Sequence, residues 1–167
     1  MVTPDEPNPE LLGHARELLN ANHYLTLATV SGGGQPWITP VYFSWAGEWE
    51  FLWVSALDTE HSRNLAERPA VALTVFDSTV PAYHGQAVYA VGEGRAVPSD
   101  ELDDRLAHYP GPAGRGGRVF AREELTGDSP WRLYQAAATE LWVLCPGEPR
   151  RACTLHNISK DHRARVL

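Results

Sequence analysis

The chain has 167 residues, of which 43% are hydrophobic and 21% charged, a composition typical of a soluble globular protein with one core. Its formal net charge of -7 leaves no basic surplus to neutralise phosphates, which argues against a nucleic-acid-binding protein. No apolar run approaches the roughly 20 residues of a membrane span, and the acidic start "MVTPDEPNPE" is unlike a signal peptide. We therefore expect a cytoplasmic protein without a membrane segment.

The chain reads as a disordered lead, residues 1–9, followed by one domain, residues 10–167. An amphipathic helix is predicted before residue 22 from the helical spacing of Leu11, Leu12, Ala15, Leu18 and Leu19.

The next three apolar runs predict strands over 24–30, 37–45 and 49–56. Short turns join them, so we expect an antiparallel meander. Pro40 cannot donate to a strand ladder, which predicts an edge position or a bulge.

A short polar helix is expected at about 59–67, and strands at 70–78 and 86–97. Gly92 and Gly94 within the second of these strands predict a bulge. Ser99 is a plausible N-cap for a helix over 100–109.

A glycine-rich stretch, 110–118, is typical of a mobile loop, and 120–125 predicts a short helix. We interpret 129–136 as a helix start or a turn and 138–146 as the last strand, with the tail unassigned. Sequential antiparallel strands with segregated helices indicate an α+β fold built on a small closed or half-closed barrel.

The polar helix at 59–67 is the most informative segment. Thr59, His61, Ser62 and Arg63, with Ser55 at the preceding strand end, add donors to the free N–H groups of a helix N-terminus. This pattern fits an anion site. It also fits an exposed connecting helix whose Arg63 pairs with a carboxylate, and residue chemistry alone favours this second interpretation.

The segments "LATV", "TPVYF", "FLWVS", "HSRNL", "RPAVALTVFDS", "GEGRAV" and "ATELWVL" occur in an order that resembles the flavin-binding split β-barrel proteins related to pyridoxamine 5'-phosphate oxidase. The likeness covers about Tyr24 to Leu144. It implies a six-stranded antiparallel split barrel with a few peripheral helices. It also implies a homodimer that holds two FMN molecules at its interface.

The resemblance implies cofactor-binding roles for eleven side chains. Those expected near the isoalloxazine ring are Trp37, Ile38, Thr39, Pro40 and Gln86. Those expected near the ribityl chain and phosphate are Val54, Ser55, His61, Ser62 and Arg63. Trp131 is expected to reach the site from the partner chain.

Two departures from the family pattern matter. Glu60 and His61 stand where the oxidase carries an Arg-Lys pair, which weakens the charge on a phosphate site and leaves the deazaflavin F420 as an alternative to FMN. The oxidase's Arg-x-His substrate signature is absent from "DHRAR", 161–165, so pyridoxamine phosphate oxidation is not expected.

We accordingly expect an FMN-binding oxidoreductase acting on a small organic substrate, in which the flavin carries the chemistry and no side chain is catalytic. A haem- or flavin-binding module without turnover is the alternative. The seven histidines show no i, i+4 pair, and Cys145 and Cys153 read as free, packed thiols, so no metal site is expected.

Overall fold

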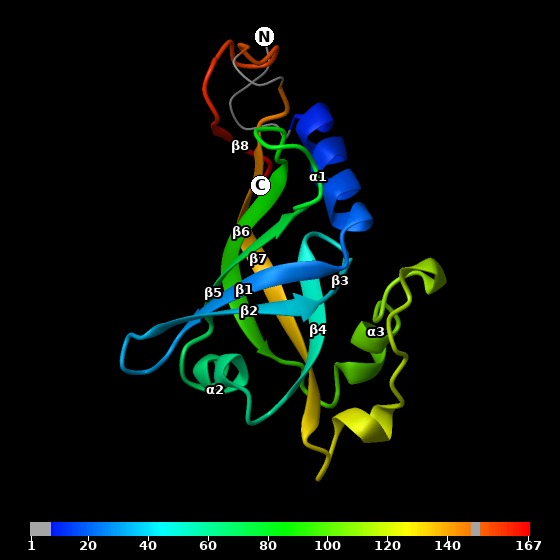
Figure 1. Ribbon diagram of the computed structural model, residues 1–167. Helices are drawn as coiled ribbons and strands as arrows, with labels where there is room; N and C mark the ends of the chain where they lie inside the picture. The colour runs from blue at the N-terminus through cyan, green and yellow to red at the C-terminus, as the bar shows by residue number, and fades with distance from the viewer. Residues whose placement is uncertain (1–7, 148–150) are drawn as a thin grey trace.

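A curled antiparallel sheet forms the body of the molecule, as Figure 1 shows for the computed structural model, which describes residues 8–147 and 151–167. Its strands are β1 (Tyr24–Val30), β2 (Pro36–Tyr42), β3 (Ser44–Ala46), β4 (Glu50–Ala56), β5 (Ala70–Phe76), β6 (Ala87–Ala96), β7 (Trp131–Leu144) and β8 (Arg163–Arg165). They follow the order β2-β1-β5-β6-β7-β4-β3, and β8 pairs with β7. Six of these strands are long, and β3 and β8 have only three residues each. The expected α+β split barrel is confirmed.

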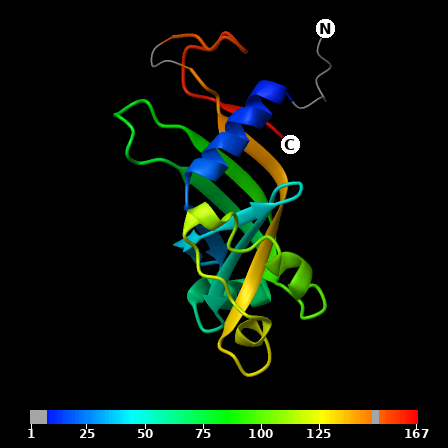
Figure 2. The same cartoon turned by 90° about the vertical axis from the view of Figure 1, so that its right-hand side faces the viewer.

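The helices lie around this sheet. They are α1 (Pro9–Ala21), α2 (Glu60–Glu67) and α3 (Leu102–Leu106), with 3-10 turns at Ala113–Arg115 and Arg122–Leu125. Figure 2 shows α1 lying against the strands, where it buries Leu11, Ala15 and Leu19. Asn8 caps this helix by accepting a bond from the Glu10 N–H at 2.9 Å. Residues 1–7 of the expected lead lie outside the described part.

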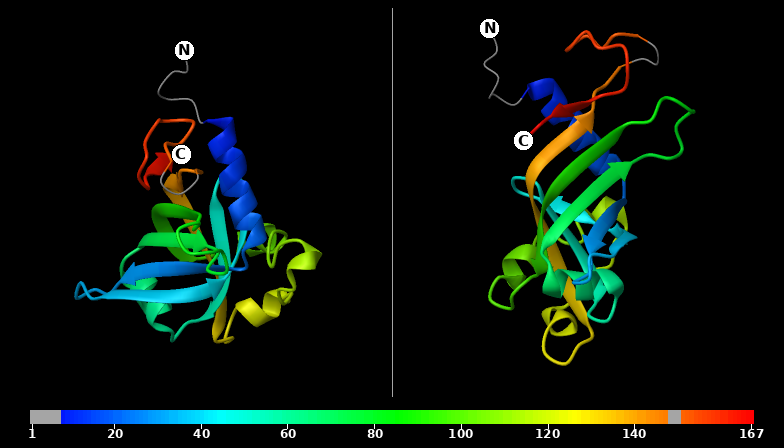
Figure 3. Two further views of the ribbon diagram at one scale, coloured as in Figure 1. Left: turned by 45° about the horizontal axis from the view of Figure 1, so that its top comes forward. Right: turned by 90° about the vertical axis from the view of Figure 1, so that its left-hand side faces the viewer.

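The expected meander is confirmed, except that its second strand, 37–45, is divided at Phe43 into β2 and β3. β1 pairs with β2 and β3 pairs with β4, and β4 pairs with β7 on its other side. β2 and β3 follow each other in the chain but stand at opposite ends of the strand order. The sheet is therefore curled into a half-barrel (Figure 3). Pro40 does lie on an edge strand, as predicted, because β2 pairs only with β1 among the described strands.

Strand β7 corrects the expectation of a helix start or turn at 129–136. It begins at Trp131 and runs without interruption to Leu144, pairing with β4 on one side and β6 on the other. Its alanines favour helix as isolated residues, but two flanking strands supply a full set of ladder bonds and override that preference. The helix expected from Ser99 is also shorter, since α3 is capped at Glu101.

The bulge predicted in β6 is confirmed. The register between β6 and β7 shifts between Val91 and Gly92. A Cβ atom on Gly92 would lie 2.0 Å from the Ala137 carbonyl oxygen, so only glycine lets the two strands approach this closely.

Arg115 ties the glycine-rich loop, 110–118, to the rest of the fold. Its guanidinium donates hydrogen bonds at 2.7–3.2 Å to the carbonyl oxygens of Leu19, Asn20, Asn22 and Phe43. Three of these carbonyls lie at or just after the C-terminal end of α1, where backbone acceptors lack intrahelical partners. The loop thus supplies the cationic cap that α1 does not carry in its own last turn.

Candidate functional site

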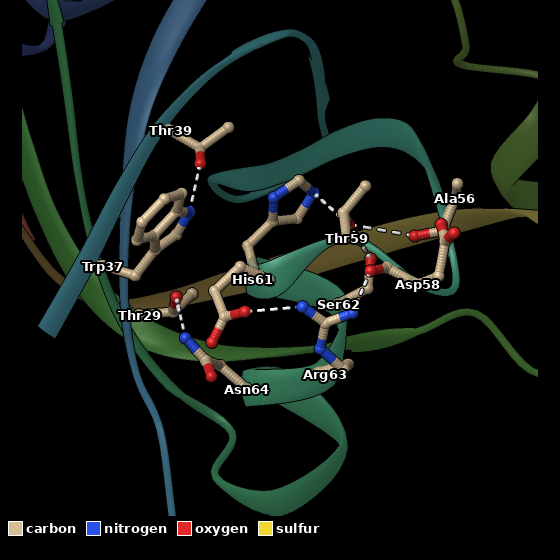
Figure 4. A network of polar contacts seen from close by, with 11 residues as sticks. Thr29, Trp37, Thr39, Ala56, Asp58, Thr59, His61, Ser62, Arg63 and Asn64 are labelled. Carbon is tan, nitrogen blue, oxygen red and sulfur yellow. Dashed lines mark hydrogen bonds and ion pairs between the residues drawn. The ribbon is translucent and has the colours of Figure 1, made fainter. Parts of the chain in front are cut away.

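A buried polar network lies where β4 ends and α2 begins (Figure 4). The Ser55 hydroxyl is 2.8 Å from Nε2 of His61, and the Thr59 hydroxyl is 2.8 Å from the Ser62 hydroxyl and 3.2 Å from the same His61 nitrogen. Ser55, His61 and Ser62 are each no more than 6% exposed. The strand end and the helix start therefore hold three of the predicted phosphate-site side chains within one hydrogen-bonded group.

The first turn of α2 keeps its backbone donors free of a side-chain cap. Thr59 occupies the N-cap position in an extended conformation, but its hydroxyl donates to the Ala56 carbonyl at 2.9 Å and makes no capping bond. The opening N–H groups of a helix have no intrahelical acceptor, and the helix dipole places positive charge there. This end of α2 therefore offers backbone donors without a side-chain cap, although Glu60 places an acidic side chain in the same turn.

His61 contributes to this group as a neutral side chain. Burial lowers the pKa of its imidazole below the usual 6.5, because the charged form would lose its hydration. At neutral pH the ring is therefore a hydrogen-bonding group and not a cation. The weak positive charge considered from the sequence is absent unless a bound anion restores it.

Arg63 does not face the network. Its guanidinium lies 2.6 Å from the Glu60 carboxylate and donates to the Asp58 carbonyl, and its side chain is 56% exposed. This is the geometry of the alternative interpretation, an exposed connecting helix with a paired arginine. An ion pair this exposed contributes little to stability.

Asn64 is a buried polar residue that the sequence analysis missed. Its amide donates to the Thr29 hydroxyl at 3.0 Å, and both residues are nearly fully buried. The bond fastens α2 to β1. A sequence signal existed, because Asn64 follows His61 by three residues and so lies on the same helix face.

Strand β2 places its predicted residues on two different faces. Trp37 pairs with Thr29, which contacts α2 through Asn64, so Trp37 and Thr39 lie on the side of the sheet that α2 covers. The Trp37 indole donates to the Thr39 hydroxyl at 2.7 Å. Ile38 and Pro40 point to the outer side. Trp37 is 48% exposed and Ile38 65% exposed, so neither is a core residue.

Three predicted residues are not brought into the network. Val54 alternates with Ser55 along β4 and packs against the hydrophobic cluster of Leu52 and Leu133, and Trp131 shares that face. Gln86 precedes β6 at the end of the sheet far from α2, where it bonds His14 at 3.0 Å. The structure thus gathers Ser55, His61 and Ser62 directly and leaves Gln86 apart.

The curled antiparallel half-barrel, with the short helix α2 between β4 and β5, places the chain in the class of split-barrel proteins. Within that class the chain belongs to the pyridoxamine 5'-phosphate oxidase family, whose sequence profile matches residues 11–145. No curated protein sequence matches the chain.

Solved structures agree on the fold. Protein Atu2129 of Agrobacterium tumefaciens, of unknown function, superposes with a TM-score of 0.67 at 21% identity, covering 86% of this chain and 60% of that one. HutZ, the haem storage protein of Vibrio cholerae, gives 0.66 at 22% identity, covering 82% and 96%. A haem-binding protein of Mycobacterium smegmatis gives 0.66 at 17% identity, covering 95% and 59%. The chain thus spans about three fifths of the first and third of these proteins.

In the described part of the chain, the helices are too short or too polar to cross a membrane.

Proposed function

We propose that this chain is an FMN-binding flavoprotein, an oxidoreductase for a small organic substrate that works as a cytoplasmic homodimer of one domain, residues 10–167. The observation that carries the proposal is the uncapped first turn of α2 beside the buried hydroxyls of Ser55 and Ser62. Membership of the pyridoxamine 5'-phosphate oxidase family supports it.

The phosphate of FMN is proposed to sit at the N-terminal end of α2. The N–H groups of the first turn supply fixed donors. The hydroxyls of Ser55 and Ser62 can rotate their hydrogens away from their present partners, His61 and Thr59, and toward an anion. His61 adds a ring N–H. Arg63 joins only by leaving Glu60, which is possible because that pair is exposed. F420 presents a phosphate as well, so this end of the site does not separate the two cofactors.

The isoalloxazine ring is proposed to lie along β2. Pro36 through Ile38 are exposed, although β2 forms one wall of the barrel. Trp37 and Thr39 offer an aromatic surface and a hydroxyl on the side of α2, while Ile38 and Pro40 frame the outer side. Such apolar edges are typical of a surface that a ligand or a second subunit covers. Gln86 is left out of the proposed site because it lies at the other end of β6.

The dimer is proposed to form through the outer face of the sheet. The register aligns Ile38 with Ala28, Ala28 with Ala72, and Ala72 with Val91, which makes an apolar row across four neighbouring strands. Ile38 and Val91 are 65% and 36% exposed. Pairing two such rows removes apolar surface from water. Trp131, which is 45% exposed and faces away from Ser55 in its own chain, is then available to the partner's site.

The flavin, when bound, supplies the electron-transfer chemistry. The side chains of the chain bind the phosphate, orient the ring and exclude water from one side of it. We propose no acid or base among them, since the buried titratable residue at the site, His61, is engaged by Ser55 and Thr59.

The test is a titration of the purified chain with FMN, F420 and haem, followed by flavin fluorescence or the haem absorption spectrum. We expect tight binding of FMN, bleaching of the flavin colour by a reduced nicotinamide, and a dimer in sedimentation. Binding of haem with none of the flavins would overturn the proposal in favour of the module without turnover. A monomer that still binds FMN would remove only the dimer.

A further inference from the structure

The segment after β7 brings together four side chains that span 17 positions of the sequence. They are Cys145, Cys153, His156 and His162, and their ligand atoms all lie within 4.8 Å of one another. Figures 1 and 3 show this C-terminal segment at the end of β7 where α1 begins, with α2 at the opposite end of the sheet. The cluster is therefore separate from the proposed flavin site.

Four of the six separations between the ligand atoms match those of a tetrahedral metal centre, and the other two are within 4.8 Å. A zinc ion with bonds of about 2.3 Å to sulfur and about 2.05 Å to nitrogen places neighbouring sulfur and nitrogen atoms about 3.5 Å apart and two nitrogens about 3.3 Å apart. The three sulfur–nitrogen separations recorded are 3.4, 3.6 and 3.6 Å. The two imidazole nitrogens, Nδ1 of His156 and Nε2 of His162, are 3.2 Å apart.

Hydrogen bonding alone does not account for this packing. Nδ1 of His156 lies within 3.6 Å of both cysteine sulfurs and of Nε2 of His162. One ring nitrogen carries either one proton or one lone pair, so it satisfies one of these three neighbours at a time. A cation at the centre of the four atoms satisfies all of them.

The surroundings of the cluster orient its members for a metal. Nδ1–H of His162 donates to the Lys160 carbonyl at 2.9 Å, which leaves the Nε2 lone pair facing the cluster, a common outer contact of metal-bound histidines. The backbone N–H of His156 donates to the Cys153 sulfur at 3.2 Å. The Cys145 N–H donates to the His162 carbonyl at 2.9 Å, so the tail is held beside β7 at this point.

The thiols are suited to the same role. A bound dication favours the deprotonated form of a thiol, so both cysteines can serve as ligands. Both cysteines are free of disulfide bonds.

We propose that Cys145, Cys153, His156 and His162 bind one Zn²⁺ ion as a structural site. Two thiolates and two neutral imidazoles cancel the charge of the ion, which suits a half-buried position, and four protein ligands leave no open position for a substrate. Tetrahedral sulfur–nitrogen sets select zinc among the common divalent ions. The ion fastens the tail, through β8, to the end of β7.

The spacing of the ligands explains why the sequence analysis expected no metal. Seven residues separate the two cysteines, two separate Cys153 from His156, and five separate the histidines. The last two intervals are usual for zinc sites, but the first is longer than the usual two to four residues. Only the turn of the chain after β7 makes Cys145 a neighbour of the others.

The test uses the full chain, purified in reducing buffer and given Zn²⁺, with metal analysis and native mass spectrometry as readouts. We expect about one zinc per chain, and tetrahedral thiolate–cobalt absorption bands when Co²⁺ replaces it. Cys153→Ser and His156→Ala lower the affinity for Zn²⁺ by more than about 100-fold, which exceeds the loss usual for outer contacts. His108→Ala, an exposed histidine elsewhere in the chain, retains zinc fully.

His156 is exposed, so His156→Ala is expected to fold even where Cys153→Ser does not, and circular dichroism checks this. A folded chain that binds no zinc, or zinc held equally by His156→Ala and His108→Ala, would overturn the proposal. None of these results depends on whether FMN binds.

Discussion

The Ser55 hydroxyl lies 2.8 Å from Nε2 of His61, and this contact joins the end of β4 to the first turn of α2. Both residues are buried. The strand end and the helix start are thereby held in one position before any ligand arrives, which reduces the ordering that binding an anion requires.

The burial of His61 makes stability depend on pH. The folded pKa is lowered from 6.5, so below that pH the unfolded chain takes up a proton that the folded chain refuses. The contribution of His61 to the free energy of unfolding is therefore expected to be fully present above the unfolded pKa. It should be lost as the pH drops toward the folded pKa. Urea denaturation of His61→Gln, compared with the parent between about pH 7.5 and about pH 5.5, should show a flatter profile. His108→Gln is the matched control, and a profile unchanged in His61→Gln would contradict the assignment.

Removing the Ser62 hydroxyl is expected to weaken FMN binding. A hydrogen bond to a charged group contributes about 1.5–3 kcal/mol, so Ser62→Ala should raise the dissociation constant by about 10- to 100-fold. Flavin fluorescence titration measures the change. Ser78→Ala, an exposed serine beyond β5, should bind FMN as the parent does. Equal affinities for the two variants would place the phosphate away from α2.

The bond from Asn64 to Thr29 is expected to stabilise the attachment of α2. Asn64→Ala leaves the buried Thr29 hydroxyl without its partner, which costs about 1–3 kcal/mol of unfolding free energy. Thr29→Val combined with Asn64→Ala removes both polar groups, so the double variant should lose less than the two single losses added together. Strict additivity in chemical denaturation would show that the two side chains are not coupled.

Two glycines of the chain are expected to respond in opposite directions to alanine. At Gly92 the new Cβ would meet backbone atoms of β7 at 2.0 and 2.9 Å, so Gly92→Ala should destabilise the fold by about 3 kcal/mol or more. At Gly13, in the middle of α1, a new Cβ would have no atom from outside the neighbouring helix backbone within 4 Å. Gly13→Ala should therefore stabilise the fold by about 0.5–1 kcal/mol. Thermal unfolding of both variants tests this. A neutral Gly92→Ala would mean that the bulge can move.

The sequence predicted the features that depend on neighbouring residues. Apolar runs located β1 and β5, helical spacing located α1, and Gly92 marked the bulge, because each pattern depends on residues that are neighbours along the chain. The hydroxyls at the start of α2 were also found in this way, since a helix N-terminus and its flanking donors lie within one turn of chain.

Long-range packing decided the rest. Whether 131–136 became strand depended on the two strands that flank it, β4 and β6. The meeting of Cys145 with His162 depended on the path of the tail. Such contacts join residues that share no local pattern, and their free energy comes from burial and pairing that only the folded chain provides.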